Sequence, residues 1–584
     1  MNKIVSLLCC LFLVQCYNVL AQDMPNHLTD EEKLLMPSFL NQTFSPDKSG
    51  EKVFFTPPPY TGLRSMAEWE EISALIVTWT SYTSILRDIV KNAVNECIVY
   101  VNCTDSATVK TYLTSGGVNL TNVRYIIAPY NSVWCRDYSA NNVYTNQVDS
   151  LILVDWKYNR PTRPSDDTLP RALAKRTGLQ LYEMSASPNL LIATGGNYMG
   201  DGLGTAMSSK LIEQENTNLT SAQIDTMTKQ YMGIDRYVHY ETLPYDGIHH
   251  IDMHMKLLDE ETMLVGQYPT GIADGPQIEA NIQYLLANFN SVFGTPYKIV
   301  RIPQPPDPTS LNYPNNGASY FTYTNGVFVN KTFIFPTYYA KYDTTATRIY
   351  KENLPGYTVV GINCNASIPS SGAIHCITHC VGSYNPLLIS LQRLPDTYNT
   401  TLPYTVNAKI MNKSGIQSAW LFYRTDTTQA YVQVSMTLTN ASQNIWSGDI
   451  AAQNGGKTVY YYVKAQSNNG KQQVRPITSP TGCYNFNVLL PNSIEVLQEQ
   501  TQMLSIYPNP ANAITCIPVE TSQPIDATIE LFNMLGGKVK TIFKGKLPMG
   551  KSNYFIDASS LSSGTYFVKM TTANAMKYQK LIVK

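Results

Sequence analysis

Five of the seven histidines lie in two short segments, residues 249–254 and 375–380. In the first segment polar and apolar residues alternate, which predicts a half-buried strand with His250 and Asp252 on its polar face. In the second, Cys376 follows a turn and strand that would expose it as a nucleophile beside a histidine. The competing interpretation is a zinc site, because His and Cys are common ligands of that metal. Its ligands would be His250, His254, Cys376 and His379.

Acidic and basic residues elsewhere indicate what such a site would bind. Asp137 lies in the sequence Trp134-Cys-Arg-Asp-Tyr, and a carboxylate among aromatic residues is costly to bury unless it meets a cation. Asp137 and Asp252 together would suit a planar guanidinium group. Arg160 and Arg163 stand in a stiff proline-containing loop, where they could clasp a carboxylate or lie in solvent.

Alternating strands and helices must position these residues. Within residues 66–395, apolar runs typical of strands, such as 74–79 and 150–156, alternate with segments of helical spacing at 85–94 and 277–289. The repetition of this strand and helix unit predicts one α/β body.

The two ends of the chain carry export signals. Residues 1–21 combine a positive start, an apolar run and a small-residue cleavage point, which predicts a signal peptide, and 22–65 would be a pro-segment or linker. Short alternating strands predict a β-sandwich over 396–490, and a linker at 491–503 leads to 504–584. That last region resembles the C-terminal sorting domain of the type IX secretion system in its Tyr-Pro-Asn-Pro start, Asn-x-x-Gly turn and Leu-x-x-Gly-x-Tyr strand. The resemblance implies a partner in the outer-membrane secretion machinery, and a protein secreted or attached to the outer-membrane surface.

Composition narrows the classes of function. The chain has 43 basic and 43 acidic residues, so its formal charge of zero suggests no nucleic-acid surface. Apolar residues make up 43% of the chain, enough for a sizeable core, and no stretch is apolar for the roughly 18 residues that a membrane helix needs. Cysteines are too sparse for a disulfide scaffold.

Four motifs occur in the order and spacing of the guanidine-modifying enzymes, at residues 134–137, 194–197, 250–252 and 372–379. Within that superfamily the chain resembles the agmatine deiminase branch, and most closely the Porphyromonas-type peptidylarginine deiminases. The resemblance implies a five-bladed pseudo-symmetric α/β propeller, followed by an immunoglobulin-like β-sandwich and a small C-terminal β-sandwich. It also implies catalysis without a metal or another cofactor.

The resemblance also implies roles for single residues. Hydrolysis of peptidyl arginine, expected at a C-terminal Arg, would give citrulline and ammonia through a covalent thiouronium. The catalytic residues would be Cys376 as nucleophile, His250 as general acid and base, Asp137 and Asp252 as guanidinium clamp, and Asn325 as an active-site amide. Other substrate contacts would come from Trp134, Asn197, and Arg160 and Arg163, which would bind the free carboxylate.

Three alternatives stay open at this point. The motifs also fit a deiminase of agmatine or free arginine, although export and Arg160 favour peptide or protein substrates. A zinc-dependent hydrolase would use the histidine and cysteine ligands named above. A non-enzymatic surface adhesin would explain the sandwich domains and the sorting signal without any chemistry.

Overall fold

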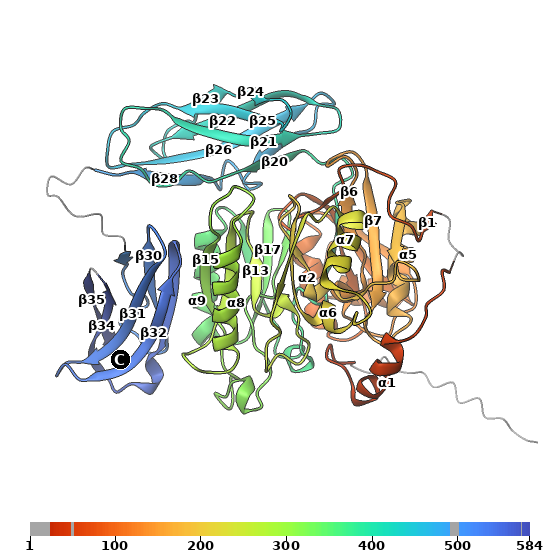
Figure 1. The fold of residues 1–584 in the computed structure, drawn as a ribbon, viewed down its shortest axis with the longest axis horizontal. Helices are drawn as coiled ribbons and strands as arrows, with labels where there is room; N and C mark the ends of the chain where they lie inside the picture. The colour runs from red at the N-terminus through yellow and green to blue at the C-terminus, as the bar shows by residue number, and fades with distance from the viewer. Residues whose placement is uncertain (1–23, 48–51, 491–500, 574) are drawn as a thin grey trace, which may run out of the picture.

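The computed structural model describes residues 24–47, 52–490, 501–573 and 575–584 (Figure 1). The predicted signal peptide, residues 1–21, and most of the predicted linker, 491–503, lie outside the described residues. A mixed α/β body is followed by two all-β regions, one above the body and one beside it in Figure 1. No helix of the described ranges is long and apolar enough to cross a membrane.

The body contains five sheets, and each repeats the same unit. Two strands pair antiparallel, and a helix connects the second strand to a third strand that lies parallel to it. This is the repeated strand and helix unit that the sequence predicts. The strands of the first two sheets are β19 (His379–Gly382), β3 (Ile72–Thr78), β4 (Ile98–Cys103) and β5 (Val123–Ile127), then β1 (Val53–Phe54), β8 (Leu181–Met184), β7 (Leu151–Tyr158), β6 (Asn141–Tyr144), β2 (Arg64–Ser65) and β9 (Ile192–Ala193). The other three sheets are formed by β10 (Met199–Gly200), β11 (Thr205–Ser209) and β12 (Arg236–Tyr240), by β13 (Met255–Leu257), β14 (Thr262–Gln267) and β15 (Lys298–Pro303), and by β16 (Val327–Val329), β17 (Thr332–Thr337) and β18 (Thr358–Asn363).

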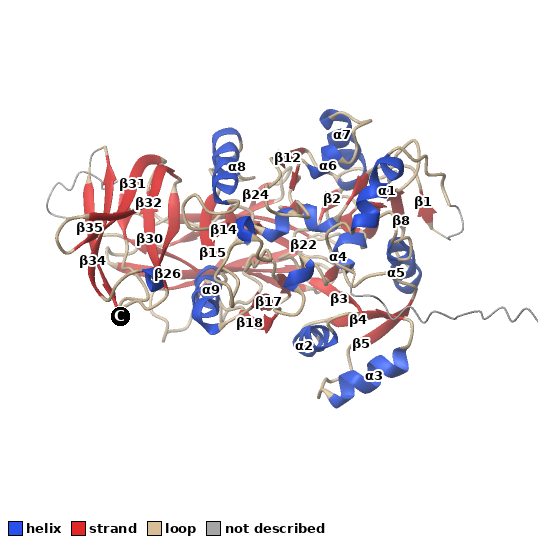
Figure 2. Cartoon of the chain, turned by 90° about the horizontal axis from the view of Figure 1, so that it is seen from below, coloured by secondary structure: helices blue, strands red, loops and turns tan. Residues whose placement is uncertain are grey.

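Helices lie outside the sheets of the body, as Figure 2 shows from below. In α2 the residues Ile85, Leu86, Ile89 and Val90 are buried, because their helical spacing puts them on one face against the sheet. The predicted helices at 85–94 and 277–289 are confirmed with shifted ends. The longer helices that follow β1 are α2 (Thr83–Ala93), α3 (Ser106–Ser115), α5 (Leu169–Thr177), α7 (Ser221–Met232), α8 (Gly275–Asn288) and α9 (Ala340–Asn353).

Two sheets that share one hydrophobic core follow the body. Along β21 the residues Tyr404, Val406, Ala408 and Ile410 are buried, with more exposed residues between them, as expected for a strand with one face toward a core. Arg475 reaches down to the body, where it binds Glu260 at 2.8 Å. The strands are β20 (Leu388–Leu391), β21 (Tyr404–Met411), β25 (Ile445–Ile450) and β24 (Thr437–Asn440) in one sheet, and β23 (Val432–Ser435), β22 (Ile416–Arg424), β26 (Lys457–Ser467), β27 (Gln472–Arg475) and β28 (Tyr484–Val488) in the other.

The C-terminal region is also built from two sheets around its own core. It packs beside β15, and Ile514 and Phe555 join the hydrophobic core of the body. Arg348 of α9 lies over the ring of Tyr507, 3.1 Å from its centroid. The strands are β29 (Thr501–Met503), β30 (Ile514–Thr521) and β33 (Gly550–Asp557), and β32 (Lys538–Leu547), β31 (Ile525–Asn533), β34 (Gly564–Thr572) and β35 (Met576–Val583).

Candidate functional site

Loops and single-turn helices between the sheets carry the residues of the candidate site. Asp137 lies on α4 (Cys135–Tyr138), which contacts the turn η2 (Gly195–Asn197). That turn contacts η3 (Ile251–Met253), which carries Asp252 and directly follows His250. Cys376 lies in the loop before β19. Four segments from different sheets therefore bring their motif residues to one place.

The predicted strand over residues 250–255 is wrong. The segment turns as a 3-10 helix, with hydrogen bonds from the Met253 and His254 backbone N–H groups to the carbonyls of His250 and Ile251. His249 enters it with a φ of 55°, which a strand does not allow. Alternation also fails as a signal here, because the polar and apolar residues of the segment are all buried.

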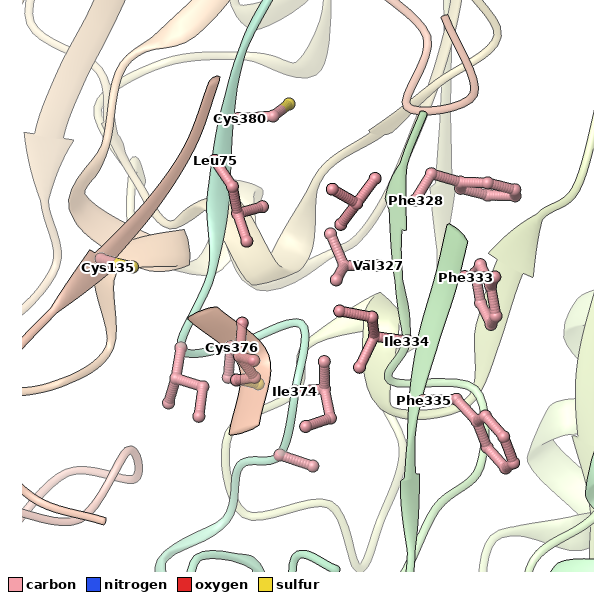
Figure 3. Packing of buried hydrophobic residues seen from close by; sticks show 14 of the residues in the cluster. Leu75, Cys135, Val327, Phe328, Phe333, Ile334, Phe335, Ile374, Cys376 and Cys380 are labelled. Atoms are coloured by element: carbon pink, nitrogen blue, oxygen red, sulfur yellow. The ribbon is translucent and has the colours of Figure 1, made fainter. Parts of the chain in front are cut away.

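Cys376 is fully buried, which overturns the expectation of an exposed nucleophile. Asn325 Nδ2 donates to Cys376 Sγ at 3.2 Å, and Asn325 Oδ1 accepts from the His375 backbone N–H at 3.0 Å. The amide therefore holds both the thiol and the loop that carries it. Figure 3 shows Cys376 and Cys380 on one continuous loop and strand, Cys135 on another segment, and Ile374 near Cys376.

Burial and the nearby carboxylates Asp252 and Asp137 raise the pKa of the Cys376 thiol well above its usual range. Burial disfavours the thiolate because it takes a charge out of water, and two negative neighbours oppose a third negative charge. The site is consequently built around a thiol that a cation between those carboxylates would activate.

The two carboxylates of the site each have one oxygen engaged by the protein. Asp137 Oδ1 accepts the Gly196 backbone N–H at 2.9 Å, and Asp252 Oδ2 lies 2.6 Å from His375 Nδ1 and 3.7 Å from Cys376 Sγ. Asp137 Oδ2 and Asp252 Oδ1 are buried and have no protein partner among the described residues. Two such acceptors can take the N–H donors of a guanidinium group.

His250 completes the reactive set. Its Nδ1 lies 3.5 Å from Asp137 Oδ1, and the whole side chain is buried. Burial lowers its pKa, against the opposing effect of Asp137 and Asp252, so the neutral ring is favoured. A neutral imidazole can accept a proton and return it, as a general acid and base requires.

A partly buried ionic network lies behind Asp252, and the sequence does not predict it. His375 Nε2 lies 2.5 Å from Glu68 Oε1, and Glu68 also pairs with Lys256 and with Arg136. Despite burial, His375, Lys256 and Arg136 lower the pKa of Glu68 well below its usual range. The two ring nitrogens of His375 thus contact one carboxylate each, and this bridge holds Asp252 in place.

The sequence indicates this network only through His375, which directly precedes Cys376. Glu68 lies 307 residues away in the chain, and nothing in its local sequence links it to the site. For Asp252 burial tends to raise the pKa, but the hydrogen bond and charge of His375 lower it, so the carboxylate stays ionised.

The predicted substrate contacts divide into two groups. Asn197 is occupied within the fold, since its side chain exchanges two hydrogen bonds with the Ser209 backbone. Trp134, Arg160 and Arg163 are instead engaged by residues near the N-terminus: Trp134 Nε1 donates to the Met24 carbonyl at 2.8 Å, and Arg160 Nε to the Asn26 carbonyl at 3.1 Å. Arg163 does clasp a carboxylate, that of Glu32.

The proposed zinc ligands do not form one cluster. His379 Nδ1 lies 3.0 Å from the Cys380 carbonyl, and burial lowers the pKa of His254 to about 4. In the described part of the chain no group of three or more His, Cys, Asp or Glu side chains is arranged to hold a metal ion.

Known proteins share the body of this chain. A provisionally named agmatine deiminase of Legionella pneumophila is 25% identical over 281 residues, 44% of this chain and 74% of that protein. One from Marinomonas is 21% identical over 365 residues, covering 56% of this chain and 96% of its own. The solved agmatine deiminase of Enterococcus faecalis has the same fold, with a TM-score of 0.50 at 16% identity over 57% of this chain and all of that one.

Two families account for most of the sequence. Residues 505–584 match the secretion system C-terminal sorting domain, so the protein is exported and is either secreted or held at the outer-membrane surface. Residues 64–381 match the Porphyromonas-type peptidyl-arginine deiminases and carry every catalytic motif described above. This chain belongs to the Porphyromonas-type peptidyl-arginine deiminase family, whose members modify guanidino groups.

Proposed function

We propose that the protein is a secreted protein-arginine deiminase that converts peptidyl arginine, chiefly at a C-terminus, to citrulline and ammonia. The observation that carries this proposal is the pair of free carboxylate oxygens, Asp137 Oδ2 and Asp252 Oδ1, beside Cys376 and His250. A guanidinium held there would present its central carbon to the sulfur.

In the first step the guanidinium cation offsets the repulsion that Asp137 and Asp252 exert on the thiol. The Cys376 proton passes to His250, the thiolate sulfur forms a bond to the guanidinium carbon, and one C–N bond breaks. The leaving nitrogen takes the proton from His250 and departs as ammonia. A thiouronium joins the substrate to Cys376.

In the second step water attacks the thiouronium carbon and His250 accepts its proton. The C–S bond then breaks as the added hydroxyl loses its proton, one of the two released protons returns to the sulfur and the other passes to solvent, and the side chain has become citrulline. Asn325 supports both steps, because its amide donates to the sulfur at 3.2 Å and so stabilises the thiolate. His375 is a positioning residue that acts through Asp252.

Preference for a C-terminal arginine rests on Arg160 and Arg163. Both are buried, and the pairing of Arg163 with Glu32 demonstrates that its guanidinium can hold a carboxylate by two parallel hydrogen bonds of 2.9 and 2.8 Å. A substrate carboxylate would use the same donors.

Agmatine is the second candidate substrate, and the names of the curated relatives favour it. Agmatine has no carboxylate, so it would gain nothing from the two arginines. Mass spectrometry of the conversion of the guanidino group to a ureido group on a peptide ending in Arg, the same peptide with internal Arg, and agmatine decides between them. We expect the terminal Arg to react fastest; equal or faster reaction of agmatine would refute the proposed specificity.

We further propose that the five repeated sheets, within residues 66–395 and their flanking strands, are the blades of a pseudo-symmetric propeller. The region 396–490 would be an immunoglobulin-like domain and 504–584 the sorting domain. The separate hydrophobic cores of the two all-β regions support these boundaries. Limited proteolysis should cut first between them, within 491–503; an early cut inside a core would contradict the division.

A further inference from the structure

The N-terminal segment, residues 24–40, lies on the residues that were expected to bind substrate. Arg160 donates from two of its nitrogens to the Asn26 carbonyl, and Trp134 donates to that of Met24. The Asn26 backbone N–H donates to the Ser370 carbonyl at 2.7 Å, in the loop that leads to Cys376. The segment thus contacts three parts of the chain around the site, at Trp134, Arg160 and Ser370.

The strongest contact is between α1 (Asp30–Leu40) and the arginine loop. Glu32 Oε1 and Oε2 accept hydrogen bonds of 2.9 and 2.8 Å from Arg163 Nε and Nη2, and Thr162 donates to Oε1 at 2.8 Å. Glu32 and Arg163 are both fully buried. This two-point geometry is the one by which a guanidinium binds the carboxylate at the end of a peptide.

The segment is docked on the body and is not part of its core. Its buried apolar residues Met36 and Phe39 form a small cluster with Ile192, separate from the main core. Leu34 is 83% exposed. Among the residues that the structure describes, the buried side-chain amide of Asn26 has no hydrogen-bond partner. Figure 1 shows α1 at the end of the body opposite the β20–β28 region.

The catalytic residues are closed off from solvent in this structure. Cys376, His250, Asp137 and Asn325 have no exposed surface, and a protein substrate cannot reach a fully buried thiol. Asn26 and Glu32 occupy the hydrogen-bond donors of Arg160 and Arg163. These contacts therefore compete with a substrate carboxylate for the same donors.

We propose that residues 24–40 are an intramolecular ligand of the arginine pair, in which Glu32 takes the place of the substrate carboxylate until the segment is released. This inference rests on the proposed function, because it assigns the regulation of the same site. Only the fraction of molecules with the segment undocked would bind substrate, so docking lowers the apparent affinity by that fraction.

The first test weakens docking within the full chain. In Glu32→Gln the amide keeps the capping hydrogen bond to the Thr29 N–H but loses the charge that pairs with Arg163. Glu31→Gln, on the exposed side of the same helix, is the matched control with the same charge change. We expect kcat/KM for a peptide ending in Arg to rise at least about tenfold in Glu32→Gln and to stay unchanged in Glu31→Gln.

The second test uses binding, which does not depend on activity. A site for a sequence-specific protease at 48–51 allows the folded chain to be cut, the cut segment is separated from the body, and a synthetic peptide of residues 24–46 is then added back. Calorimetry should detect binding that a peptide ending in Arg displaces, and the Glu32→Gln peptide should bind at least about tenfold more weakly.

The outcomes separate the two proposals. Binding and displacement without any citrulline formation would overturn the proposed function but keep the inference. Full activity with the segment attached, no gain in Glu32→Gln, or a peptide that does not bind would each overturn the inference. A lower melting temperature with unchanged kcat/KM would show that the segment only stabilises the fold.

Discussion

His375 offers the sharpest test of how the site is held together. Replacing it in His375→Asn removes the 2.6 Å contact to Asp252 and the 2.5 Å contact to Glu68. A hydrogen bond to a charged group such as the Asp252 carboxylate contributes about 1.5–3 kcal/mol. If Asp252 loses that much of its hold on the guanidinium in the transition state, kcat/KM falls by about 10- to 150-fold.

The pH dependence gives an independent readout. His375 lowers the pKa of Asp252, while burial alone would raise it. In the unsubstituted protein the carboxylate is therefore ionised above its lowered pKa, and the variant needs a higher pH to ionise it. The acid limb of kcat/KM should move to higher pH, and the stability that ionised Asp252 contributes should be lost at a higher pH as the solution is acidified.

The control is His379→Asn, which removes another buried imidazole from the same region but one that bonds the Cys380 carbonyl. For both variants we would measure ammonia release from an arginyl peptide as a function of pH, and the melting temperature. If His375→Asn loses no more activity than His379→Asn and keeps the same acid limb, then His375 does not position Asp252.

Three further predictions concern the reacting groups. His250→Gln should lower kcat by about 10²- to 10⁴-fold, measured as citrulline formation, with little change in KM. Gly196→Ala would place a Cβ 2.4 Å from His250 Nδ1 and 2.8 Å from Asp137 Oδ1, so kcat/KM should fall about 10²-fold, while Gly247→Ala, with nothing within 4 Å, should keep full activity. Exhaustive chelation should leave citrulline formation unchanged; its loss would favour a zinc hydrolase.

The sequence was sufficient for the organisation of the body and for the residues that meet in the site. Helical spacing located α2 and α8, and motif spacing named Cys376, His250 and Asp252, which the structure brings together. These features can be predicted because periodicity and motifs are patterns within short stretches of sequence.

Features that depend on distant contacts could not be predicted. In the segment at 250–255 polar and apolar residues alternate as in a half-buried strand. All of these residues are buried, however, so the alternation does not mark one buried and one exposed face. Glu68 meets His375 only through the fold. The occupation of Arg163 by Glu32 joins residues 131 positions apart, and no local pattern marks either as a partner of the other.

The contact of the sorting domain with β15 and α9 has a consequence for maturation. Ile514 is 5% exposed because it inserts into the core of the enzyme, and returning such a side chain to water costs about 1.5–3 kcal/mol. Arg348 would also give up the ring of Tyr507. Detaching the domain after a cut between β28 and β29 would therefore also require these contacts to break. Cleavage of the chain and release of the sorting domain would be separate events, and a cleaved molecule could retain the domain through these non-covalent contacts alone.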